Sequence, residues 1–248
     1  MAAAGHVALT TSRHGGEVAV DLTAPGMIAA VVQALRPDVV LHLAALARLD
    51  LCERDPARAR AVNATAAEGL AARFGARLLF VSTDLVFDGR HAPYAATAPV
   101  SPLSVYGASK AEGEEAVRAH GGRVARLPLL FGPDAQRRGA SAALRAALGE
   151  PAPVTLYTNE YRTPLHVVDA ARALVELAAV PDGPSLVHVA GPERVSRWEF
   201  GTRFCRLHGL PVERLQAAEC MDPLRPRDVA LAGDWPMVRG LDAMLADA

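Results

Sequence analysis

A tyrosine and a lysine four residues apart form the most reactive pair that the sequence offers. Tyr106 and Lys110 are the first and last residues of the segment YGASK. On a helix this spacing places both side chains on one face, where the ammonium favours the phenolate and lowers the pKa of the tyrosine. Such a phenol can act as a general acid or base toward a carbonyl or a carbinol. An exposed helix with an ordinary Tyr/Lys pair has the same spacing. The surrounding elements must therefore decide between a catalytic pair and an ordinary surface pair.

The hydrophobic pattern predicts an α/β fold with a doubly wound parallel sheet. Short apolar runs alternate with Ala-, Arg- and Glu-rich stretches of helical period, which is typical of buried parallel strands covered by helices on both faces. Ligands of such sheets bind at the carboxyl ends of the strands. The predicted strands span 6–12, 39–43, 78–82, 124–127 and 186–189, and the predicted helices span 25–34, 57–74, 105–120, 140–148, 168–179 and 197–208.

This sheet places the reactive pair at its functional edge. Thr83 follows the strand that ends at Ser82, and Tyr106 lies at the start of the helix after the next loop. We therefore expect Thr83 and Tyr106 to meet at the carboxyl ends of the strands. A turn or cap residue is the alternative interpretation of Thr83.

Composition excludes several classes of partner. The net charge is -1, and the sequence has no basic run, no apolar stretch of membrane-spanning length and no signal-peptide pattern. We expect no nucleic-acid or membrane partner and a cytoplasmic location. Cys52, Cys205 and Cys220 are far apart, so neither a metal site nor a disulfide framework is expected.

The character of the chain changes near Arg137, after which proline-rich joints become frequent. We expect a dinucleotide-binding region over 1–136 and a mainly substrate-binding region over 137–248. Because a predicted sheet strand near Val187 falls in the second region, the two regions should interleave rather than form independent domains.

Several segments together resemble the extended short-chain dehydrogenase/reductases, and within them the sugar-nucleotide branch typified by dTDP-4-dehydrorhamnose reductase. The resemblance implies a Rossmann-type fold and reduction of a nucleotide-linked 4-keto-6-deoxy sugar by NAD(P)H. It implies that Tyr106 is the proton donor, that Lys110 lowers its pKa and binds the nicotinamide ribose, and that Thr83 hydrogen-bonds the substrate oxygen. The segments that carry it are VVLHLAALARLDLCERDP, LLFVSTDLVFDG, SPLSVYGASKAEGEEAV, RLPLLFGP and YRTPLHVVDAARAL.

The resemblance also implies a cofactor site for NADP or NAD. A cation at Arg13 suits the 2'-phosphate of NADP, although a solvated surface arginine is the alternative. Asp21 could instead cap the following helix, and the small Ala44 and Ala45 could serve helix packing. The implied cofactor-binding residues are Arg13, Asp21, Leu22, Ala44, Ala45, Ser82, Tyr106 and Lys110.

The glycine-rich turn that holds the pyrophosphate in this family is missing from the sequence. The chain begins MAAAGHVALTTSR, which resembles the end of the family's first helix followed by its second strand. We expect either that the natural protein begins further upstream, the favoured explanation, or that the chain is a cofactor-free relative. The strands near 7–12 and 39–43 should then lack a shared neighbour, and a chain extended upstream should be more stable.

The substrate is less well determined. The resemblance places Thr83, Asp84, Leu85 and Leu129 near the sugar, with a turn-shaping role as the alternative for Asp84. The family commonly has aromatic residues at the two leucine positions. A different keto sugar or an epimerase-like reaction therefore stays open. Arg162 and Arg225 could clamp the nucleotide diphosphate, with solvated ion pairs as the alternative.

A second class of function is compatible with the same resemblance. The regulatory β subunit of methionine adenosyltransferase belongs to this group and works by binding an enzyme, so a chain without the glycine turn could be a binding or regulatory module. Homodimerisation through the helix predicted over 57–74 is a further expectation from the resemblance.

Overall fold

The central element is a parallel sheet of four short strands. The computed structural model describes residues 5, 7–13, 17–133, 139–180 and 182–248. The strand order is β10-β5-β4-β3, and every neighbouring pair in it is parallel. The expected parallel sheet is confirmed, and its strands are β3 (Val40–His42), β4 (Leu78–Thr83), β5 (Arg123–Leu127) and β10 (Leu186–His188).

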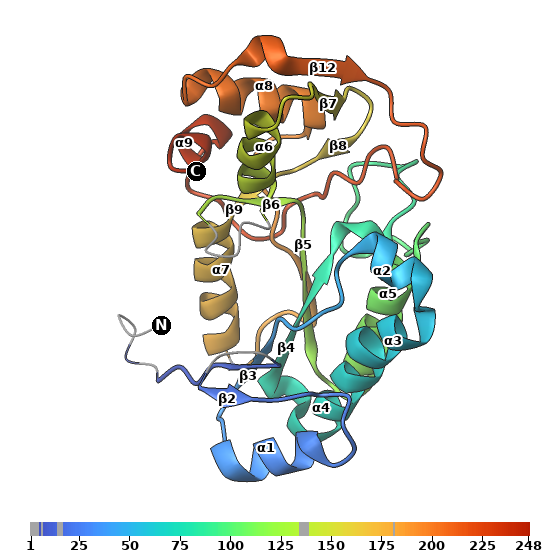
Figure 1. Cartoon of the computed structure of the whole chain (residues 1–248). Coiled ribbons are helices and arrows are strands. Elements are labelled where there is room, and N and C mark those ends of the chain that lie inside the picture. The colour runs from blue at the N-terminus through green and yellow to red at the C-terminus, as the bar shows by residue number, and fades with distance from the viewer. Residues whose placement is uncertain (1–4, 6, 14–16, 134–138, 181) are drawn as a thin grey trace.

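Helices cover both faces of this sheet, as the continuous apolar strands predict. Helices α4 and α5 lie on one face and α7 on the other, as Figure 1 shows. Leu79 of β4 joins the core on the α7 side, whereas its neighbour Phe80 packs with α4 and α5 on the opposite side. The covering helices are α4 (Ala66–Phe74), α5 (Val105–Ala119) and α7 (Val167–Ala179).

The helix predicted over 57–74 is interrupted by a π-helical turn. Its parts are α3 (Pro56–Arg60), the π turn Ala61–Thr65 and α4. The buried Asn63 in that turn bonds the backbone of Leu46 through both amide atoms and donates to the Ser109 hydroxyl. The Asn63 amide in this π turn therefore links the helix by hydrogen bonds to the loop after β3 and to α5.

The N-terminal strands lie apart from the sheet. Strand β1 (Thr11–Ser12) pairs only with β2 (Val18–Ala19), and β3 pairs only with β4, within the part of the chain that the structure describes. Strands β1 and β3 therefore lack a shared neighbouring strand, as expected. Apolar side chains beside both edges are open to solvent: Val7 is 89% exposed and Leu43 is 60% exposed. The predicted strand over 6–12 shortens to β1, and His6 lies outside the described residues.

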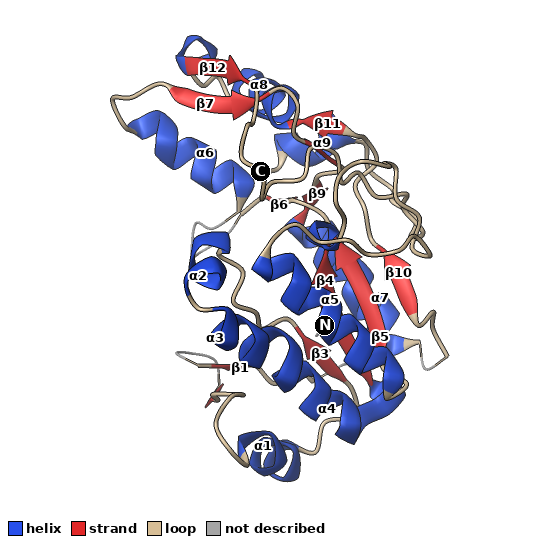
Figure 2. Cartoon of the chain, turned by 90° about the vertical axis from the view of Figure 1, so that its right-hand side faces the viewer, coloured by secondary structure: helices blue, strands red, loops and turns tan. Residues whose placement is uncertain are grey.

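The second half of the chain builds a lobe at the carboxyl end of the sheet, visible at the top of Figure 2. Its two-residue strands and the short helix α9 (Leu241–Ala246) escaped sequence-based prediction because such short elements show no periodicity. Strand β10 lies in this half and joins the central sheet beside β5. Among the described residues, no helix has the length and apolar character needed to cross a membrane.

The remaining elements are α1 (Met27–Leu35), α2 (Leu49–Arg54), β6 (Leu130–Phe131), α6 (Ala140–Gly149), β7 (Val154–Tyr157), β8 (Tyr161–Arg162), β9 (Leu165–His166), β11 (Val195–Ser196), α8 (Arg197–Leu207), β12 (Leu215–Ala218) and α9 (Leu241–Ala246).

Candidate active site

The start of α5 carries Tyr106 to the carboxyl end of β4. Ser104 caps the helix by accepting a hydrogen bond from Gly107 N at 3.2 Å, and Glu53 of α2 accepts one from Val105 N at 2.8 Å. These two acceptors satisfy backbone donors that a helix leaves unpaired at its first turn. They fix the direction in which α5 begins.

Glycine at position 107 lets the helix approach β4 closely. A Cβ atom at this position would overlap the carbonyl oxygen of Leu85, in the turn that follows β4. This approach brings the phenol of Tyr106 beside the Thr83 side chain, a neighbour that acts to lower the pKa of the phenol. The expected meeting of Thr83 and Tyr106 at the carboxyl edge therefore occurs in the structure.

The side chain of Lys110 takes a different direction from the one that its spacing suggests. Its Nζ donates to the carbonyl of Val81 at 2.6 Å and lies 3.7 Å from the centre of the Phe80 ring. The residue is only 2% exposed, and this burial lowers the pKa of Lys110 to about 7.

The expectation that Lys110 lowers the pKa of Tyr106 is wrong for this structure. Burial raises the pKa of the Tyr106 phenol, and the nearby carboxylate of Asp84 raises it further. The reason is that desolvation disfavours the phenolate, while the ammonium of Lys110 is directed to the Val81 carbonyl. Tyr106 therefore holds its proton throughout the neutral pH range.

Replacing the buried lysine should stabilise the fold. We expect Lys110→Met to raise the free energy of unfolding by roughly 1–3 kcal/mol below about pH 7, since a buried charge is removed and the volume is kept. The pKa of Lys110 is about 7 in the folded state, below its ordinary value of 10.5. The wild-type protein therefore takes up a proton when it unfolds at a pH between these two values. Wild-type stability then rises with pH across that window, and the advantage of the variant shrinks. Urea unfolding at a series of pH values measures this, and a constant or negative difference would contradict it.

A chain of buried ion pairs leads from the site into the second lobe. Arg162 Nε lies 3.4 Å from Asp84 Oδ2, and Arg162 Nη2 lies 3.4 Å from Glu160 Oε1. Arg225 Nε reaches Glu160 Oε2 at 3.3 Å. Asp84, Arg162 and Glu160 are all buried, so the predicted substrate ligands Asp84 and Arg162 face each other in the interior. Only Arg225, with a third of its side chain exposed, can reach an outside ligand.

Arg197 belongs to the same charged group, although sequence reasoning missed it. Its Nη1 is buried without a hydrogen-bond partner among the described residues, and burial lowers the pKa of Arg197 to about 10. The available signal was its place directly after Ser196, which forms a capping box with Glu199 at the start of α8.

Several of the predicted cofactor residues lie at the surface of the protein. Ala44 and Ala45 are exposed after β3, and Arg13 is exposed after β1. The carboxylate of Asp21 accepts two bonds from Thr23, its backbone N and its hydroxyl.

Four further predicted residues lie in or against the packed interior. Leu22 packs against the α4 core, and Ser82 is buried with a hydroxyl that has no partner among the described residues. The predicted sugar contacts Leu85 and Leu129 are partly buried against separate core clusters.

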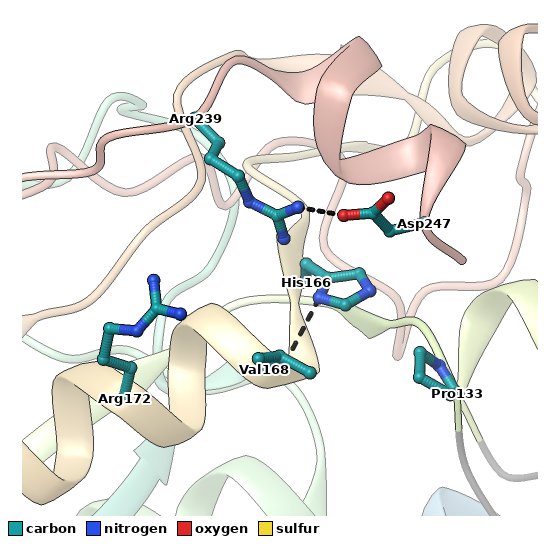
Figure 3. Close-up of a pocket in the computed structure, with 6 residues that line it drawn as sticks. All are labelled: Pro133, His166, Val168, Arg172, Arg239 and Asp247. Atoms are coloured by element: carbon teal, nitrogen blue, oxygen red, sulfur yellow. Dashed lines mark hydrogen bonds and ion pairs between the residues drawn. The ribbon is translucent and has the colours of Figure 1, made fainter. Parts of the chain in front are cut away.

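A separate pocket of about 340 Å³ lies at the start of α7 and is drawn in Figure 3. Arg239 bonds both Asp169 and Asp247 there, and His166 Nδ1 accepts a hydrogen bond from Val168 N at 3.3 Å. The carboxylates neutralise the guanidinium, so this pocket offers no unbalanced charge for the chemistry at Tyr106.

The parallel sheet, with threonine, tyrosine and lysine at and below its carboxyl edge, defines a Rossmann-like protein of the extended short-chain dehydrogenase/reductase class. The family model described as RmlD substrate binding domain matches residues 1–231, and the chain belongs to this family.

Two of the similar curated proteins have different functions by name. Methionine adenosyltransferase 2 subunit beta of Xenopus laevis is 31% identical over 202 residues, which cover 76% of this chain and 60% of that protein. The dTDP-4-dehydrorhamnose reductase of Burkholderia thailandensis is 44% identical over 106 residues, 41% of this chain and 36% of that protein. The chain thus spans less than two thirds of the length of these relatives.

A crystal structure supports the fold assignment. The dTDP-4-dehydrorhamnose reductase of Bacillus anthracis, solved in complex with NADP, superposes with a TM-score of 0.83 at 22% identity. The match covers 92% of this chain and 85% of that one. At this identity the likeness shows the fold alone.

Proposed function

We propose that the protein reduces a nucleotide-linked 4-keto-6-deoxy sugar with a nicotinamide cofactor, with dTDP-4-dehydrorhamnose as the first substrate to test. The observation that carries the proposal is the contact between the Tyr106 phenol and Thr83 at the carboxyl end of β4. The name of the Burkholderia thailandensis relative supports the choice of substrate.

In this reaction Tyr106 is the general acid. Because burial raises the pKa of its phenol, the residue is protonated at neutral pH and can protonate the oxygen of the keto group. Thr83, beside the phenol, can donate a second hydrogen bond to the same oxygen once its proton is released from Asp84. A bound NADPH would supply the hydride.

The predicted cofactor residues would contact the nicotinamide half and the adenosine half of NADPH, whereas the pyrophosphate between them has no predicted binding segment. Tyr106, Ser82 and Lys110 would hold the nicotinamide half, with Lys110 turning from the Val81 carbonyl to do so. Arg13, Asp21 and Leu22, together with Ala44 and Ala45, would hold the adenosine half. The sequence has no glycine-rich turn for the pyrophosphate. We therefore expect this chain to bind NADPH weakly.

The substrate's diphosphate has one accessible partner in the group of buried ion pairs. Arg225 is partly exposed, and its guanidinium lies over the ring of Tyr157 at 5.6 Å. An arginine placed against an aromatic ring suits a phosphate of the nucleotide sugar. Asp84 and Arg162, in contrast, are buried, so they would affect the substrate through neighbouring residues and not by contact with its diphosphate.

Enzyme assay with separate binding measurements tests the proposal. The purified protein is incubated with NADPH and dTDP-4-dehydrorhamnose, and the loss of NADPH absorbance is followed. Binding of NADPH is measured independently by the change in its fluorescence. Turnover that requires the Tyr106 hydroxyl supports the proposal. Tight NADPH binding without turnover of this or related keto sugars refutes it.

A regulatory module is the second candidate, favoured by the similarity to methionine adenosyltransferase 2 subunit beta over three quarters of the chain. In this case the protein would bind a methionine adenosyltransferase and alter its activity. Co-elution of the two purified proteins in size-exclusion chromatography would support this function, and separate elution at micromolar concentration would exclude it.

A further inference from the structure

The Thr83 hydroxyl already uses its only proton within the protein. It donates to Asp84 Oδ1 at 3.1 Å and accepts from Leu85 N at 3.2 Å, and the phenol of Tyr106 lies beside it. A hydroxyl has one proton and two acceptor positions. While Asp84 is a carboxylate and takes that proton, Thr83 can only accept from Tyr106 and has no proton left for a substrate oxygen.

A protonated Asp84 reverses this direction. The carboxylic acid then donates to Thr83 Oγ1, and the threonine proton is released toward Tyr106 and the position of the substrate oxygen. The state of one buried side chain thus decides whether Thr83 is a donor or an acceptor at the site.

The arginine behind Asp84 lies on the side of the carboxyl oxygen that does not face Thr83. Arg162 Nε forms an ion pair with Oδ2 at 3.4 Å, although Oδ2 accepts no hydrogen bond among the described residues, whereas Oδ1 is the atom bonded to Thr83. The guanidinium is itself held by the carbonyl of Tyr161 at 2.9 Å and by Glu160. Because a guanidinium can only donate, it keeps an acceptor oxygen on its own side and leaves the other position for Thr83.

We propose that Asp84 is a positioning residue that sets the direction of the Thr83 hydroxyl, held in register by Arg162 of β8, and that the reductive reaction uses the form in which Asp84 is protonated. This inference rests on the proposed reductase function for its activity readout only.

The surroundings of Asp84 make such a change of state accessible near neutral pH. Burial raises the pKa of Asp84 to about 6, against the opposing effect of Arg162 and the Thr83 hydrogen bond. Glu160 adds to the increase. The other groups that face this cluster are Tyr106 from α5, Arg197 from α8 and Arg225, which pairs with Glu160.

Asp84→Asn is the decisive variant because its orientation is determined by the same arginine. Arg162 selects the amide oxygen, so the amide NH2 faces Thr83 and donates to it, as the protonated acid does. In the wild type we expect kcat/KM to fall about tenfold per pH unit above the pKa of Asp84. The variant should lose this decline and exceed the wild type by about tenfold or more near pH 8.

Asp88→Asn is the matched control. Asp88 lies in the same loop and accepts from Arg90 N and from the Tyr94 hydroxyl, and neither bond involves Thr83. This variant should keep the wild-type decline. A folded Asp84→Asn protein that retains the decline, or that is as inactive as Tyr106→Phe at every pH, would overturn the inference.

A spectroscopic measurement separates this inference from the proposed function. In Asp84→Asn the pKa of Tyr106 should fall, because a negative charge is removed and Thr83 then donates to the phenolate. Ultraviolet difference titration of Asp84→Asn against the Asp84→Asn/Tyr106→Phe double variant isolates this phenol. A reductase assay without turnover would reject the proposed function and leave this titration to decide; an unchanged Tyr106 pKa would reject the inference itself.

Discussion

Tyr106→Phe is expected to lower the turnover of the keto sugar by about 10²- to 10⁴-fold, the usual contribution of a positioned general acid. The change removes only the phenolic oxygen, while the ring keeps its place in the first turn of α5. Binding of NADPH should stay within about threefold of the wild type, since the acid acts on the substrate oxygen. Steady-state kinetics and the fluorescence titration measure the two effects separately.

Tyr94→Phe is the matched control for this prediction. The Tyr94 hydroxyl bonds the backbone N of Arg90 and of His91 and the Asp88 carboxylate, all within one loop. Its loss should reduce stability without a comparable fall in turnover. Equal turnover by Tyr106→Phe and the wild type would remove the proposed acid from the mechanism.

Glu114→Gln is expected to lower the free energy of unfolding by about 3–5 kcal/mol, because it leaves a buried guanidinium without its counter-charge. Arg126 on β5 bonds Glu114 on α5 through Nε and Nη2, and both side chains are at most 5% exposed. The pair connects the helix that carries Tyr106 to the central sheet. Denaturant unfolding followed by circular dichroism measures the loss.

The same helix supplies a control. Glu112 pairs with Arg60 at the surface, where both side chains are largely solvated. Glu112→Gln should cost less than about 1 kcal/mol. If both glutamate variants lost equally little, the buried pair would not hold α5 on the sheet, and the placement of Tyr106 would need another explanation.

The cofactor half of the site was the least predictable part. Arg13, Asp21 and Ala44 were assigned from the resemblance, and each is exposed or partly exposed, beside or after a short strand at an open edge. The direction of the Tyr106 pKa was predicted wrongly from the helical spacing. Spacing places two side chains on one face, but the atom to which Lys110 Nζ turns depends on the strand below it.

By itself the sequence determined the central parallel sheet, its covering helices and the meeting of Thr83 with Tyr106. These follow from short apolar runs alternating with stretches of helical periodicity, together with the rule that parallel strands direct their carboxyl ends to one edge. Only the tertiary structure decided that Arg162 lies against Asp84, that Arg197 joins them and that Lys110 is buried under the site. Such contacts join residues far apart in the chain, and the pKa of each group depends on local burial and on neighbouring charges that no periodic pattern encodes.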